Sequence, residues 1–124
     1  MAYVKISYGE IIDKYTILEI KLKNITDVNK RAHIQEELAV VLPIVKSLTK
    51  GDILELTQNL KSINQSLWVI EDQIRMKERI SQFDEEFIDL ARSVYLKNDE
   101  RSKIKYKINI LTHSPLIEEK SYQS

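Results

Sequence analysis

The chain has 124 residues, including 2 glycines, 2 prolines and no cysteine, and its 19 basic and 19 acidic residues give a formal net charge of +0. This length predicts a single domain, 1–124, and the scarcity of turn-forming residues predicts a few long helices. The isolated Gly9 and Gly51 exclude phosphate-binding loops, which need clustered glycines, and the neutral balance argues against a surface for nucleic acid or an anionic membrane.

The N-terminal residues lack the apolar stretch of a secretory signal. The most apolar run, residues 38–45, is interrupted by Pro43 and is much shorter than a membrane span. The absence of cysteine suits a reducing compartment. We therefore expect a cytoplasmic protein.

A first helix is predicted over residues 8–26. Ser7 and Glu10 have the spacing of a capping box, in which each satisfies a backbone N–H near the other. Apolar residues then recur every three or four positions, at Tyr8, Ile11, Tyr15, Leu18, Leu22 and Ile25. Asp13 and Lys14 are expected on a solvated face, with Glu10 and Lys14 as an ion pair one turn apart.

A second helix is predicted over residues 28–48, after a cap signal at Asp27. Its apolar positions are Ile34, Leu38, Val41, Val45 and Leu48. Gly51 is suited to a left-handed backbone at the end of this helix, and Asp52 to the N-cap of the next.

The third helix, predicted over residues 53–81, has the most regular pattern in the chain. An unbroken heptad seam runs through Ile53, Leu56, Leu60, Ile63, Leu67, Ile70 and Ile74. This spacing keeps one apolar stripe facing a partner helix.

A fourth helix is predicted over residues 85–112, with Asp84 as its N-cap. Its seam runs through Phe87, Leu90, Val94, Lys97, Arg101, Ile104, Ile108 and Leu111, so two central members are basic. A break at Asn98 and Asp99 is the alternative to a continuous helix, which we favour. The polar tail, 113–124, offers Leu116, Ile117 and Tyr122 for docking.

Four amphipathic helices with short connections predict an all-α, antiparallel up-down bundle. The third and fourth helices should be about 42 Å long and the first two about 30 Å, so the later hairpin should protrude. The protrusion would carry Met76, Ile80, Phe83 and Phe87. We expect a homodimer through this hairpin, with the C-terminal tail as the alternative cover.

Folding the fourth helix back on the third brings polar residues to the middle of the hairpin, around Asn64 and Lys97. The predicted ligand- or partner-binding residues are Trp68, Glu71, Asp72, Arg75, Arg92, Tyr95, Asn98, Asp99 and Arg101. Two interpretations stay open. The residues form either a layer of paired charges that sets helix register, or a pocket in which arginines hold a polar or anionic ligand against an indole.

No metal, cofactor or catalytic residue is predicted. Glu85, Glu86 and Asp89 resemble the carboxylate motif of all-α nucleotide pyrophosphohydrolases, which hold magnesium with a second acidic motif. The nearest candidates, Glu71 and Asp72, should lie about 7 Å further along the hairpin. The first-turn carboxylates are explained by the helix dipole alone.

A family resemblance is carried by residues 6–14, 16–21, 67–75, 90–95, 98–101 and 118–122. Together these stretches resemble a bacterial family catalogued only as domain of unknown function six-one-six-five, over nearly the whole chain. The resemblance implies a small single-domain helical protein with no established activity. It also implies a link to cell-surface polysaccharide synthesis.

We expect a non-catalytic helical module that binds a partner protein or a polar small molecule around Trp68, Glu71 and Arg92. The alternative is a small enzyme acting on an anionic or sugar-nucleotide-like substrate. In that alternative Glu71 or Asp72 is the acid/base, and Arg75 and Arg92 hold the anion. A catalytic carboxylate should be partly buried in a concave pocket, which separates the two hypotheses.

Overall fold

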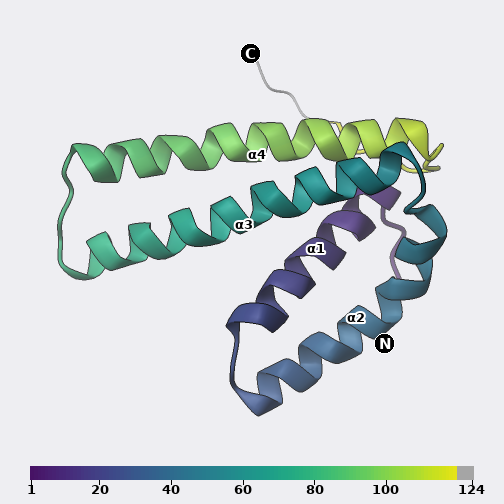
Figure 1. The fold of residues 1–124 in the computed structure, drawn as a ribbon, viewed down its shortest axis with the longest axis horizontal. Coiled ribbons are helices and arrows are strands. Elements are labelled where there is room, and N and C mark those ends of the chain that lie inside the picture. Colours follow the sequence, from purple (N-terminus) through teal and green to yellow (C-terminus); the bar gives the residue numbers. More distant parts are fainter. Residues whose placement is uncertain (120–124) are drawn as a thin grey trace.

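The computed structural model describes residues 1–119, which form four α-helices (Figure 1). The helices are α1 (Tyr8–Asn24), α2 (Val28–Leu48), α3 (Asp52–Arg79) and α4 (Glu85–Leu111). These bounds agree with the predicted ones to within two residues, and the all-α helical bundle is confirmed. The fourth helix is continuous through Asn98 and Asp99, as favoured from the sequence. Tyr122 of the predicted tail lies outside the described residues.

Side chains cap three of the four helices at the positions expected. Ser7 Oγ accepts from the backbone N–H of Glu10 at 3.1 Å, and Asp27 Oδ1 accepts from the N–H of Asn29 at 3.2 Å. Asp84 Oδ1 does the same for Phe87 at 2.9 Å. Each bond satisfies a donor that the first turn of a helix leaves without an intrahelical partner.

The turn between α2 and α3 differs from the prediction by one residue. Gly51 has the expected positive φ, 55°, but its ψ of −126° lies outside the left-handed helical region. Gly51 is itself the N-cap of α3, however, and Asp52 is the first residue of the helix. The prediction of Asp52 as the cap was therefore wrong, because the positive φ that only glycine adopts easily is needed at the cap position.

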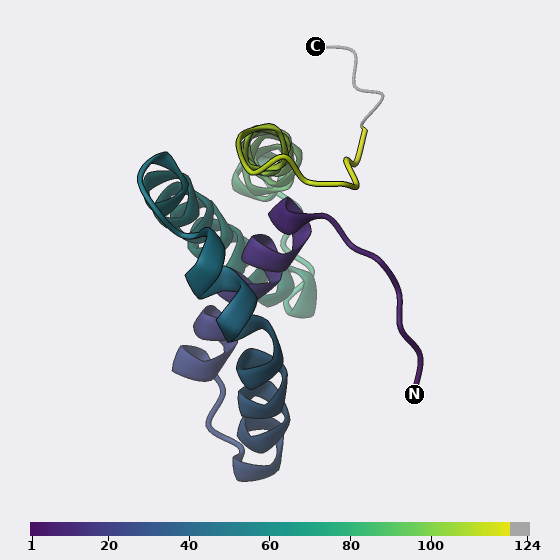
Figure 2. The ribbon, with the colours of Figure 1, turned by 90° about the vertical axis from the view of Figure 1, so that its right-hand side faces the viewer.

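Helix α1 is the centre of the bundle. It packs against α2, α3 and α4, while α3 and α4 pack along each other. Viewed end-on, α1 lies between α4 on one side and α2 on the other (Figure 2). The buried apolar core draws on all four helices, through Ile11, Ile12, Leu18, Ile34, Val41, Val45, Ile53, Leu56, Leu60 and Ile108. The first part of the predicted α3 seam is thus confirmed as core.

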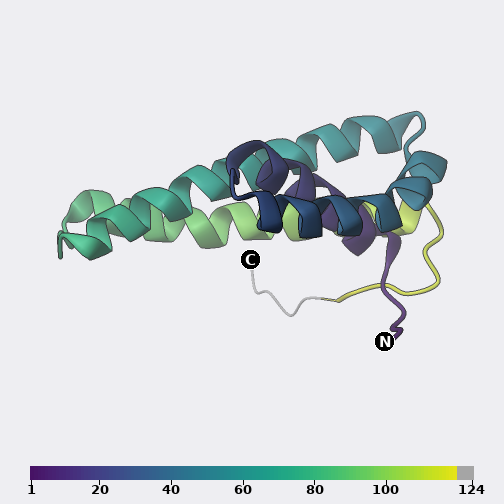
Figure 3. The same cartoon turned by 90° about the horizontal axis from the view of Figure 1, so that it is seen from below.

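The far half of the α3/α4 hairpin extends beyond the other helices. Helices α1 and α2 run obliquely to the long hairpin, whose turn end lies clear of them (Figures 1 and 3). From Trp68 to Lys97 the only buried residue is Lys77. Met76 is 60% exposed, Ile80 67% and Phe83 57%. The protruding, apolar hairpin end predicted from helix lengths is therefore present, although Phe87 is half-buried.

Polar contacts close the hairpin at its turn. Lys77 Nζ lies 3.0 Å from Asp84 Oδ2 and 3.4 Å from Glu86 Oε2. Gln82 Nε2 also donates to Asp84, at 2.7 Å. The backbone N–H of Phe87, together with Lys77 and Gln82, lowers the pKa of Asp84 from its ordinary value of 3.8 to about 2. The charged form of this carboxylate is thus favoured by folding.

The N-terminus of α1 docks directly on the C-terminal turns of α4. The backbone N–H of Tyr8 donates to Ser114 Oγ at 3.1 Å, and that of Gly9 donates to Asn109 Oδ1 at 2.7 Å. A Cβ on Gly9 would lie 2.5 Å from the carbonyl oxygen of Lys105 and 2.9 Å from Asn109 Oδ1. Only glycine therefore allows the two helices to approach this closely.

Replacing Gly9 by alanine should destabilise the fold by about 3 kcal/mol, because the added methyl group forces α1 away from α4 and weakens a buried hydrogen bond. Gly51→Ala is the matched comparison, since nothing lies within 4 Å of its Cβ position and the substitution costs only the strained φ, about 1 kcal/mol. Urea unfolding would measure both. Equal losses for the two variants would contradict the close approach at Gly9.

Asp84 should make the free energy of unfolding depend on pH in the acid range. Because its native pKa is lowered to about 2, the stabilisation is complete above pH 4 and is lost as the pH falls from about 4 through 2. Asp84→Asn keeps a capping side chain but cannot titrate. The difference in melting temperature between the native chain and this variant should therefore shrink towards zero over this interval. A difference that stays constant from pH 6 to pH 2 would rule out the lowered pKa.

Candidate functional site

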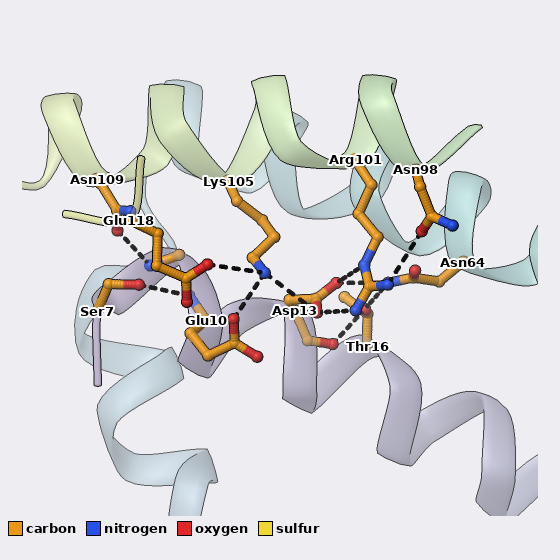
Figure 4. Close-up of polar contacts among 11 residues, drawn as sticks. Ser7, Glu10, Asp13, Thr16, Asn64, Asn98, Arg101, Lys105, Asn109 and Glu118 are labelled. Atoms are coloured by element: carbon orange, nitrogen blue, oxygen red, sulfur yellow. Dashed lines mark hydrogen bonds and ion pairs between the residues drawn. The ribbon is translucent and has the colours of Figure 1, made fainter. Parts of the chain in front are cut away.

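A polar interface joins α1 to α4 through the middle of the bundle. The side chains of Asn98, Arg101, Lys105 and Asn109 line the face of α4 that looks towards α1 (Figure 4). Opposite them stand Ser7, Glu10, Asp13 and Thr16, and Asn64 joins from α3. We refer to these nine residues as the polar interface. Their spacing of three and four along each helix places them on facing stripes.

Asp13 is the centre of the polar interface and is fully buried. Arg101 donates two hydrogen bonds to the Asp13 carboxylate. Nε donates to Oδ1 at 2.9 Å, and a terminal guanidinium nitrogen donates to Oδ2. Asn64 Nδ2 donates to the same Oδ1 at 2.9 Å and to Thr16 Oγ1, also at 2.9 Å. This two-point contact between arginine and carboxylate is the strongest form of the interaction.

Burial costs this pair its hydration, and the surrounding hydrogen bonds offset the loss. Hydrogen bonding to Asp13 raises the pKa of Arg101 further, burial opposes this, and the carboxylates of Glu10 and Glu71 add to the rise. Among the described residues, no buried side-chain nitrogen or oxygen lacks a hydrogen-bond partner. A buried pair this well satisfied fixes geometry, because any shift of α4 along α1 would leave both charges unpaired.

Lys105 forms a second ionic contact one turn further along α4. Its Nζ lies 2.6 Å from Glu10 Oε2 and 3.9 Å from Asp13 Oδ2. Glu118, beyond the end of α4, lies 3.9 Å from the same nitrogen. Glu10 therefore faces α4, and the predicted pair between Glu10 and Lys14 was wrong. Lys14 instead pairs with Glu37 of α2 at 3.0 Å.

The expectation of Asp13 on a solvated face was also wrong. A second stripe at heptad spacing, Gly9, Asp13, Thr16 and Ile20, lies beside the predicted apolar one, and all four residues are buried. Because three of its four members are small or polar, apolar periodicity does not reveal this stripe. The signal that points to it is the basic interruption of the α4 seam, because a cation in a seam needs an anion on the helix it faces.

Beside the polar interface, α1, α3 and α4 together enclose a pocket of about 200 Å³. We refer to it as the Trp68 pocket. It is lined by Ile17, Ile20, Lys21, Asn64, Leu67, Trp68, Glu71 and Arg101. Three of the predicted binding residues, Trp68, Glu71 and Arg101, therefore meet around one hollow. The contribution of α1 to the lining was not predicted, because the predicted site was built from the α3/α4 hairpin alone.

The remaining predicted residues lie elsewhere on the hairpin. Arg75 pairs with Asp72 at 3.2 Å and lies 4.0 Å from Glu71, and all three side chains are about half exposed or more. Arg92 and Tyr95 are exposed on α4. The nine predicted binding residues therefore do not form a single cluster. They lie in at least two separate groups on the hairpin.

Asn98, which belongs to the polar interface, and its neighbour Asp99 are half-buried. Asn98 Oδ1 accepts from Arg101 Nη1 at 3.3 Å, so it helps to orient the guanidinium. Lys97, expected in the polar middle of the hairpin, lies 3.9 Å from Glu100 of its own helix. Within residues 1–119, no three carboxylate or imidazole side chains gather as metal ligands would. No helix in this range has the length and apolar content to cross a membrane.

A double-mutant cycle should expose the coupling between Asp13 and Arg101. Arg101→Met leaves the buried carboxylate of Asp13 without its main partner and should cost about 3–5 kcal/mol. Asp13→Asn leaves the half-buried Arg101 unpaired and should cost about 2–4 kcal/mol. The double variant leaves no unpaired charge and should cost at least about 1 kcal/mol less than the sum. Urea unfolding would measure all three variants.

Arg75→Met is the matched control for that cycle. Its partners are exposed, so the loss should stay below about 1 kcal/mol. Additive losses at Asp13 and Arg101, or single losses no larger than that of the control, would contradict a tightly coupled buried pair.

Comparison with known proteins gives one match. No curated protein and no solved structure matches the chain. The model of one family, described as "Family of unknown function (DUF6165)", matches residues 2–124. This match spans almost the whole sequence and agrees with the resemblance seen in its motifs. The chain therefore belongs to the Family of unknown function (DUF6165).

Proposed function

We propose that this protein is a non-catalytic binding module that recognises a polar ligand, or a polar side chain of a partner protein, in the Trp68 pocket. The observation that carries the proposal is the meeting of Trp68, Glu71 and Arg101 with Lys21 and Asn64 around one hollow. An indole, an amide and charges of both signs at a single opening are the elements of a specific polar site.

The size of the Trp68 pocket limits what it can hold. Sites for drug-sized ligands measure roughly 300–1,000 Å³, whereas this pocket measures about 200 Å³. It has room for a single ring or one side chain, not for a complete nucleotide. Lys21 supplies a cation beside the acceptor Glu71, so a ring carrying both an anionic group and hydroxyl donors suits the lining. A sugar acid is such a ligand, in keeping with a link to cell-surface polysaccharide synthesis.

The arrangement of the carboxylates favours binding over catalysis. Glu71 and Asp72 are about half exposed and both lie near Arg75, so neither has the burial expected of a catalytic carboxylate in a concave pocket. Arg75 and Arg92 are exposed on the hairpin, away from the lining of the pocket. The enzyme alternative therefore gains no support from the geometry.

The proposal includes a cytoplasmic homodimer assembled through the protruding α3/α4 hairpin. The bare apolar end of the hairpin supports it, because exposed Met76, Ile80 and Phe83 would gain from a cover. Dimerisation leaves the Trp68 pocket as a separate site, on the part of the hairpin that α1 contacts.

Trp68 is the only tryptophan in the chain and so reports directly on its own pocket. Titration with hexuronates, hexosamines and their nucleoside-diphosphate esters should change its fluorescence and raise the melting temperature for at least one compound. Lys21→Ala and Glu71→Gln should weaken that response about tenfold or more, because each removes a charged contact worth roughly 1.5–3 kcal/mol.

Lys14→Ala is the matched control, since Lys14 lies on α1 but pairs with α2 outside the pocket. This variant should bind like the native chain. Unchanged fluorescence and melting temperature with every compound would contradict the small-ligand proposal. A response that survives both pocket substitutions would place the binding elsewhere on the molecule.

A further inference from the structure

We propose that a second copy of this chain binds antiparallel along the outer stripe of α3, defined as Val69, Gln73 and Met76 together with Ile80 at the C-cap of the helix. This inference deepens the homodimer of the proposed function, because it assigns the surface and the register through which two copies meet. It does not depend on whether the Trp68 pocket holds a ligand.

The outer stripe is a second heptad seam. Its members recur at intervals of four, three and four, the spacing of the two core positions in a coiled coil. Its apolar members are all half exposed or more: Val69 is 50% exposed and Ile80 67%. The first α3 seam already packs inside the bundle, so α3 presents one stripe to its own chain and another to solvent. A heptad stripe of this kind buries its side chains only against another helix.

Charge complementarity identifies that other helix as α3 of a second copy. Asp72 and Arg79 directly precede Gln73 and Ile80, and therefore flank the stripe on one side, seven residues apart. In an antiparallel pair of identical helices, Asp72 of each copy meets Arg79 of the other, which gives two opposite-charge contacts related by the two-fold axis. In a parallel pair, residues on the same flank of the two stripes lie on opposite sides of the interface, so Asp72 and Arg79 would not meet.

Core contacts in this register are also complementary. When Asp72 lies beside Arg79 of the other copy, Val69 lies opposite Ile80, and Gln73 lies opposite Met76. The larger Ile80 of each copy therefore packs against the smaller Val69 of the other, and the polar Gln73 lies against the flexible thioether of Met76. Phe83, in the turn after α3, packs edge-on against Phe87, with ring centroids 5.2 Å apart, and is 57% exposed at the same end of the hairpin.

Within one chain Asp72 pairs with Arg75 at 3.2 Å, but both side chains are more than half exposed, so Asp72 can also contact a cation of a second copy. Among the described residues, Arg79 takes part in none of the ion pairs of the hairpin, which use Arg75 and Lys77. A hollow of about 410 Å³ at the turn end is lined by Met76, Arg79 and Ile80 among others. Glu71 lies two positions before Gln73, on nearly the opposite side of the helix, so the Trp68 pocket stays open in both copies.

Charge reversal tests the register. Asp72→Arg alone places two arginines at each contact, and Arg79→Asp alone places two aspartates there, so each variant should sediment as a monomer of 14.6 kDa. The native chain should sediment at twice this mass. Mixing the two variants in equal amounts should restore the dimer, because Asp72→Arg then faces Arg79→Asp at one contact and the native Arg79 faces the native Asp72 at the other.

Recovery on mixing distinguishes the proposal from a fault in folding, since neither variant is repaired within its own chain. Circular dichroism should show full helix content for both. Val40→Glu, which adds a charge to an exposed apolar residue of α2, is the matched control and should remain dimeric. A native chain that is monomeric at its highest soluble concentration would overturn the inference and leave the stripe to a helix of another protein. A dimer unaffected by either reversal, or single variants that stay monomeric when mixed, would also overturn it.

Discussion

The contact between Asp13 and Arg101 determines how the other parts of this protein are arranged. A carboxylate with no exposure to solvent is tolerated only where every oxygen is bonded, and here Arg101 and Asn64 complete the bonding from two other helices. The carboxylate of Asp13 thereby links α1, α3 and α4. Gly9, four residues before Asp13, lets α1 approach α4 closely enough for the contact to form. The apolar core supplies most of the driving force, and the buried pair specifies which alignment of the helices satisfies it.

This arrangement divides the long hairpin into an anchored half and a bare half. The anchored half lies against α1 and carries the polar interface and the Trp68 pocket. The bare half, beyond the pocket residues Trp68 and Glu71, holds no buried apolar residue and is closed at its turn by Lys77 and Asp84. A hairpin end with no buried apolar residue of its own is well suited to binding another surface. The proposed dimer and the proposed ligand site use different faces of α3.

The helices could be predicted from the sequence because capping residues and apolar periodicity are local signals. These signals were one residue off at the turn between α2 and α3, where Gly51, with its φ of 55°, is the N-cap of α3 in place of Asp52. The partners of the charged residues could not be predicted in this way. Arg101 was recognised as unusual, but its partner Asp13 lies 88 positions away on a helix whose polar stripe resembled a solvated face. The outer stripe of α3 was likewise overlooked, because the stronger seam on the same helix explained its periodicity.

The claim that one buried pair organises the bundle is tested most directly by amide hydrogen exchange in the native chain and in Asp13→Asn. If the account holds, the variant loses protection together in α1 and in the C-terminal half of α4, because both depend on the same contact. Protection in α2, which packs on α1, should fall with them. Loss confined to the first turns of α1, with α4 protected as in the native chain, would contradict the account.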